Sequence, residues 1–116
     1  MKQGQYSVPA AAILSNWCED PWTNGVQIDL REDMEKLAVR TRNTLYEITI
    51  IEGPTGEILI RGGHYFPELT PARLAGATQG GSFCKMRGIY VGFRMELTVQ
   101  GRRFVTTPVE SIEIVP

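Results

Sequence analysis

The stretch that decides the fold is residues 91–100, VGFRMELTVQ. Apolar side chains occupy every second position, at Val91, Phe93, Met95, Leu97 and Val99. Successive side chains of a β-strand point to opposite faces of the sheet, so a period of two is typical of a strand with one buried face. We therefore predict a strand over residues 91–100 that turns its apolar side chains towards a core.

The residues after this stretch predict a hairpin and a further strand. Gln100-Gly101 is a turn signal, and residues 102–107 (RRFVTT) predict the returning strand. Pro108 has no N–H to donate to a ladder, so we expect it to mark a bend or an edge. Residues 109–115 (VESIEIV) then predict the last strand.

The first half of the chain carries similar patterns. Residues 26–31 alternate apolar and polar side chains, and residues 37–42 and 45–52 (LYEITIIE) are typical of strands. The charged run over residues 31–36 predicts a loop or a single helical turn. Residues 53–56 (GPTG) are turn chemistry and predict a hairpin with residues 57–61 (EILIR).

The middle segment, residues 62–88, shows no period and predicts a long irregular loop with one short helix over residues 70–75. Thr70 suits an N-cap, Pro71 suits the first helical position and Gly76 suits the end. The glycine pairs at 62–63 and 80–81 either cradle an anion or allow tight bends at barrel corners, and the second use is the commoner one.

Together these patterns predict a mainly β protein. We expect a small antiparallel barrel or sandwich of about six or seven strands with one short helix, because alternation alone does not distinguish a closed barrel from two packed sheets. Residues 26–116 form a single β-rich domain in this prediction, and residues 1–25 form an extended N-terminal arm that holds Trp17 and Trp22.

Composition limits the classes of function. The chain has 116 residues, 42% of them hydrophobic, and a net charge of −1, so no global field attracts it to a polyanion or an anionic membrane. The charge is divided, with five basic and nine acidic residues through residue 58 and seven and four after it. The apolar run at residues 8–14 is too short to span a bilayer, which needs about 20 residues. Two cysteines without a C-x-x-C spacing favour reduced thiols, and we predict a cytoplasmic protein.

The sequence offers weak candidates for chemistry. His64 is the sole histidine, and with Lys85 and Arg87 it outlines a site for a small anionic ligand or an enzymatic reaction in the 62–88 loop. Ser82 and Cys84 are the nucleophile candidates, but Cys84 stands where the second glycine of a G-x-S-x-G elbow belongs. We predict no metal and no cofactor, since His64 and the two cysteines lack zinc-ligand spacing.

Nucleic-acid binding is the third alternative, and the overall charge disfavours it. It would combine the basic C-terminal half with aromatic side chains that stack on bases, the candidates being Tyr65, Phe66, Phe83, Tyr90 and Phe104.

The first prediction for function is a non-enzymatic binding or assembly module that self-associates or binds a protein partner. Aromatic and arginine side chains are typical anchors of protein interfaces. The candidates for that role are Trp17, Trp22, Tyr65, Phe66 and Arg73.

Overall fold

A computed structural model describes residues 24–79 and 84–116 of the chain. These residues form nine strands and one 3-10 turn, η1 (Ile28–Leu30). The strands are β1 (Gly25–Gln27), β2 (Lys36–Thr41), β3 (Leu45–Glu52), β4 (Glu57–Gly62), β5 (Phe66–Thr78), β6 (Cys84–Met86), β7 (Gly88–Tyr90), β8 (Arg94–Val99) and β9 (Arg102–Val115). Within these residues no helix is long and apolar enough to cross a membrane.

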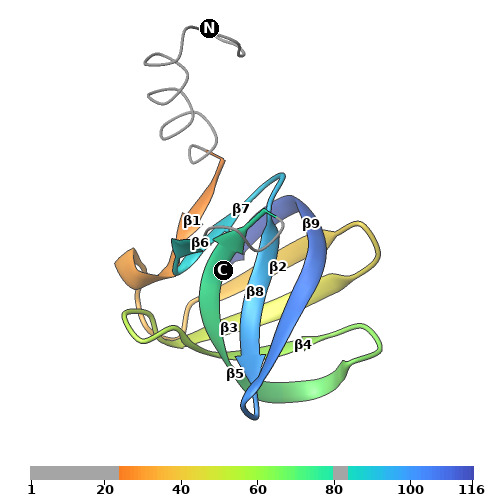
Figure 1. The fold of residues 1–116 in the computed structure, drawn as a ribbon. Helices are drawn as coiled ribbons and strands as arrows, with labels where there is room; N and C mark the ends of the chain where they lie inside the picture. The colour runs from red at the N-terminus through yellow and green to blue at the C-terminus, as the bar shows by residue number, and fades with distance from the viewer. Residues whose placement is uncertain (1–23, 80–83) are drawn as a thin grey trace, which may run out of the picture.

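Six antiparallel strands form a ring (Figure 1). Its order is β2-β3-β4-β5-β8-β9, and β9 pairs back on β2. The β4–β5 pairing closes the ring, so the mainly β prediction is confirmed in the form of a barrel-like arrangement. Neighbours in the ring follow one another along the chain, except that β6 and β7 interrupt the path from β5 to β8. β6 adds to the free side of β5, and β1 pairs with β7 in a separate two-stranded sheet.

Each of the two longest strands pairs with two neighbouring ring strands along different parts of its length. β5 pairs with β4 from Phe66 to Arg73 and with β8 from Arg73 to Thr78. β9 pairs with β8 from Arg102 to Pro108 and with β2 from Val109 to Val115. Pro108 lies at a register shift against β8, so it marks a bend inside one strand, where the sequence predicted two strands.

The core consists of the inward side chains of all six ring strands. The large apolar side chains of the ring strands that are at most 1% exposed are Leu37, Val39, Ile48, Ile50, Ile58, Ile60, Leu74, Met95, Leu97 and Val109. Burying each such side chain contributes roughly 1.5–3 kcal/mol before the loss of chain entropy is subtracted. Ile28 of η1 joins this cluster, so the segment from β1 to η1 covers part of the core that the ring leaves open.

The middle segment is where the sequence prediction was wrong. Residues 70–75 lie within β5, not in a helix, and most of residues 62–88 belong to β5, β6 and β7. Tertiary pairing overrides the local capping signals, since Ala72 and Leu74 turn inward while Arg73 points to solvent. Pro71 is tolerated because β5 at that point pairs with β4 alone, which leaves a free side for a residue without an N–H.

Two strand boundaries also differ from the prediction. Residues 26–31 divide into the end of β1 and the η1 turn, because Ile28 folds over the core. The strand predicted over residues 91–100 begins only at Arg94, since a turn precedes it in which the Phe93 N–H donates to the Tyr90 carbonyl at 3.1 Å. Phe93 packs with Ala77 and Tyr90 in a second small cluster. Except for its last two residues, the predicted arm over residues 1–25 lies outside the described residues.

We predict that Gly76→Ala destabilises the protein far more than Gly101→Ala. Both glycines have positive φ, +153° and +79°, so each alanine carries backbone strain on the order of 1 kcal/mol. A Cβ at Gly76 would also overlap the carbonyl oxygen of Lys85 on β6, whereas one at Gly101 meets no atom of the described residues within 4 Å. Urea denaturation should show a loss at least 2 kcal/mol larger for Gly76→Ala, and equal losses would contradict the close β5–β6 approach.

Candidate functional site

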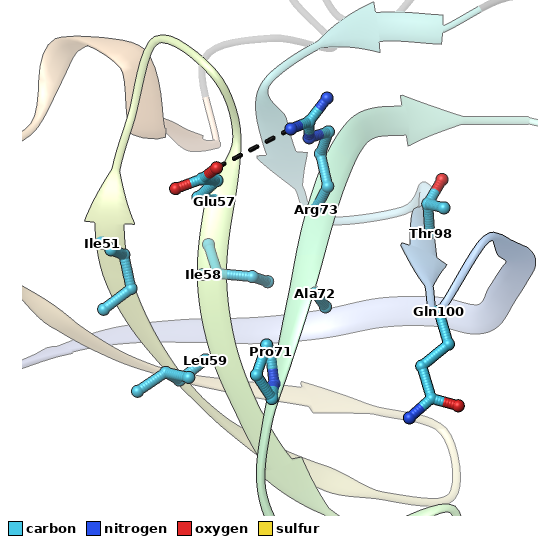
Figure 2. Close-up of a pocket in the computed structure, with 9 residues that line it drawn as sticks. All are labelled: Ile51, Glu57, Ile58, Leu59, Pro71, Ala72, Arg73, Thr98 and Gln100. Carbon is cyan, nitrogen blue, oxygen red and sulfur yellow. Dashed lines mark ion pairs between the residues drawn. The ribbon is translucent and has the colours of Figure 1, made fainter.

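A hollow of about 520 Å³ lies on the outer wall of the barrel, over β3, β4, β5 and β8 (Figure 2). Its lining contains the outward side chains of Ile51, Leu59 and Pro71. The Arg73 guanidinium and the Glu57 carboxylate form an ion pair of 3.7 Å at the hollow, shown by the dashed line in Figure 2. Arg73 is therefore one predicted interface residue that the structure places in a surface hollow.

Strand alternation explains why apolar groups appear on this wall. Along β4, Ile58 and Ile60 are buried in the core, so Glu57, Leu59 and Arg61 point outwards. Leu59 lies opposite Thr49 on β3 and opposite Pro71 on β5. These neighbours cover part of the Leu59 side chain and leave it half-buried.

A second hollow, of about 290 Å³, continues the apolar surface across β2 and β3 and is completed by single residues of β4, β5 and β9. Thr49 lines this hollow and lies opposite Leu59 of the first, which makes the two hollows neighbours. Exposed apolar side chains gather here, with Leu69 50% exposed. We call the outward-facing apolar residues of the two hollows the wall strip: Ala38, Leu45, Ile51, Leu59, Leu69, Pro71 and Val115.

Two ion pairs stand on either side of Leu59 along β4. Glu57 pairs with Arg73 of β5, and Arg61 pairs with Glu47 of β3. All four side chains are about half exposed, and exposed pairs contribute only about 0–1 kcal/mol to stability. These charges are therefore available to a partner at little cost to the fold.

The structure does not bring the predicted ligand residues together. His64 lies in the turn that leads into β5, whereas Lys85 lies opposite Ala77 near the other end of that strand. Arg87 has a structural role, because its Nη1 donates to the Leu74 carbonyl at 2.9 Å and its Nε to the Pro54 carbonyl at 3.2 Å.

The other predicted interface residues differ in their accessibility. Tyr65 is 72% exposed beside His64, but Phe66 is only 4% exposed and packs in the core. Trp17 and Trp22 lie outside the described residues. Sequence reasoning missed Leu59 and Pro71, since an outward leucine has the same residue type as a core one and Pro71 was assigned to the first position of a helix.

At least five of the seven basic residues after residue 58 have a polar partner among the described residues. Among the basic residues after residue 58, Arg61, Arg73 and Arg103 pair with Glu47, Glu57 and Glu96, while Arg87 and Arg94 donate to backbone carbonyls. Of the predicted base-stacking residues, Tyr65, Phe66 and Phe104 are in contact, Tyr90 belongs to the second cluster and Phe83 lies outside the described residues.

The remaining candidates from the sequence are the nucleophiles Ser82 and Cys84 and a metal site. Desolvation, aided by the charge of Glu96, raises the pKa of the Cys84 thiol and so lowers the fraction of reactive thiolate. Ser82 is not among the described residues. Within residues 24–79 and 84–116, no group of three histidine, cysteine, aspartate or glutamate side chains could hold a metal ion.

We predict that Arg87→Ala destabilises the protein by about 1–3 kcal/mol, because it leaves the carbonyls of Leu74 and Pro54 without their charged donor. Arg102→Ala, at an exposed position, should change stability by less than about 0.5 kcal/mol. Urea denaturation of both variants measures the difference. An Arg87→Ala protein as stable as the wild type would contradict the structural role.

We predict that Cys84 reacts slowly with iodoacetamide. In a Cys18→Ser background, its alkylation at pH 8 should be slower than that of a cysteine in a short unstructured peptide, because its raised pKa leaves less thiolate at that pH. The rate should continue to rise with pH above the pKa of the peptide thiol. Faster reaction than the peptide at pH 7 would show an activated thiol.

Comparison with known proteins gives no match for this chain. No protein-family model matches the sequence, and no curated protein and no solved structure matches it.

Proposed function

We propose that the chain is a non-enzymatic binding and assembly module, and that two copies associate through the wall strip. The observation that carries this proposal is the order of outward residues along β4, which is Glu57, Leu59 and Arg61. An acidic and a basic side chain stand at equal distances on either side of an apolar one. Such an order is complementary to itself when reversed.

A two-fold axis explains how the reversed order would be used. If the axis lies in the interface and crosses β4 at Leu59 at a right angle to the strand, each Glu57 meets the partner subunit's Arg61. One pair of contacts becomes two by symmetry, as in any isologous interface. Leu59 and Pro71 would then pack on the same residues of the partner.

The size of the wall supports a protein partner. The two hollows together draw residues from six strands and are largely apolar and edged by charge, which is the anatomy of an interface centre with a polar rim. A stable interface covers about 800 Å² of each partner. That is roughly an eighth of the surface of the described chain, 6737 Å² in total. The cytoplasmic location predicted from the sequence is compatible with this proposal.

We predict that Glu57→Arg weakens self-association at least about 10-fold. The new arginine would lie opposite Arg61 of the partner subunit, and the two-fold axis repeats this repulsive contact. The double variant Glu57→Arg with Arg61→Glu should restore it, since the reversed order remains complementary. Sedimentation velocity over a range of protein concentrations measures both. Glu110→Arg, an exposed charge reversal on β9, is the matched control and should leave the dimer unchanged.

Three results with the full-length chain would contradict the proposal. They are a wild type that stays monomeric at all concentrations, a Glu57→Arg variant that associates normally, and a double variant that does not recover. A chain lacking residues 1–23 tests the N-terminal arm separately. If that chain is monomeric while its melting temperature is unchanged, the arm carries the assembly and the wall does not.

A further inference from the structure

A third hollow, of about 300 Å³, opens at one end of the barrel between the β2–β3 turn, the β4–β5 turn and β9. It is separate from the wall strip, since none of its lining residues belongs to either wall hollow. The two turns lie close together because Gly63 has no side chain. A Cβ at Gly63 would lie 2.7 Å from Cγ2 of Thr44, and its φ of +67° also favours glycine.

Aromatic rings build one wall of this hollow. Tyr65 is largely exposed, yet its ring meets the edge of Phe104 with centroids 5.2 Å apart. Phe104 in turn meets the buried Phe66 at 5.1 Å, and Phe66 lies 6.4 Å from Tyr46. This chain of ring contacts, of which the first two are edge-on, anchors an exposed ring to the core, so the Tyr65 ring is already held in position for stacking.

Polar groups face the aromatic wall from the two turns. Within the described parts of the chain, the side-chain amide of Asn43 makes no hydrogen bond, so its donor and acceptor are both open to a ligand. His64 lines the hollow as well, with its ring edge-on to Tyr65 at 6.0 Å. Thr106 is already engaged, because its hydroxyl donates to the Thr107 carbonyl at 2.7 Å and accepts from the Met95 N–H at 3.0 Å.

The lining decides the charge and shape of the ligand. The described residues that line the hollow include no aspartate, glutamate, lysine or arginine, so they offer no permanent counter-charge for an ion. Its volume suits one small ring system, at the lower end of small-ligand sites. An exposed aromatic face binds flat rings, and an open amide can bond the edge of a heterocycle. A sugar ring would instead favour carboxylates that accept from its hydroxyls.

We propose that this hollow binds an uncharged purine or pyrimidine base, as a free base or nucleoside, with the base stacked on Tyr65 and its polar edge on Asn43. This site is independent of the proposed assembly. The lack of lysine and arginine in the lining favours a nucleoside over a base within a phosphate-linked strand.

The test is a titration of the full-length ¹⁵N-labelled protein with adenosine, guanosine, cytidine and uridine, followed by NMR. At least one nucleoside should shift the Asn43 side-chain amide signals in a saturable way. Tyr65→Ala should lower the affinity for that nucleoside about 10-fold or more, because stacking on an aromatic ring is lost. Tyr65→Phe should retain affinity within about 3-fold, and Leu69→Ala, on the wall strip, should leave it unchanged.

The controls separate this proposal from its alternatives. Ribose alone should cause no shift, and the monomeric Glu57→Arg variant should bind the nucleoside as the wild type does. Equal shifts with ribose, no saturable shift with any of the four nucleosides at 10-fold the protein concentration or up to their solubility limits, or binding of a short oligonucleotide without binding of any nucleoside would each overturn the proposal.

Discussion

Backbone pairing between β4 and β5 is the constraint on which the rest of the barrel depends. Without it the seven-stranded sheet would have open edges at β4 and β6 and no enclosed core. The pairing places Ile58 opposite Ala72 and Ile60 opposite Thr70, so the alternation of β4 decides which residues of β5 face inwards. It also turns Leu59 and Pro71 outwards as neighbours.

One pairing therefore generates both surface sites. At its start it aligns the charged and apolar side chains of the wall, with Glu57 opposite Arg73. At its other end Gly62 lies opposite Phe66, and the chain must reverse between them. That reversal presents His64 and Tyr65 at the barrel end while Phe66 returns to the core. The wall and the end hollow are thus two consequences of the same register, although they share no residues.

The sequence predicted the strands with one buried face and failed where tertiary structure decides. Residues 45–52 coincide with β3, because the stretch is rich in β-branched and aromatic side chains and contains no glycine or proline. The helix expected at residues 70–75 was wrong, since a Thr-Pro cap is a local preference and the β4 ladder is a stronger non-local one. Tyr65 was chosen as a candidate for an interface or for base stacking from its residue type alone, and both roles stay predictions. Leu59 could not be predicted as a surface residue, because outward and inward leucines look alike in one sequence.

The pairing of β2 with β9 has a consequence for how the chain reaches this structure. Lys36 lies opposite Val115, so the first strand of the ring stays without one of its two neighbours until nearly eighty further residues have been synthesised. Contacts between such distant residues are slow to form, and a strand edge that waits is open to a strand of another chain. The β9 strand of a second copy could form the same backbone hydrogen bonds with β2 as the β9 strand of the same chain does. The order of strands in the ring therefore leaves β2 open to strand exchange while the chain folds, whatever the surface of the folded molecule.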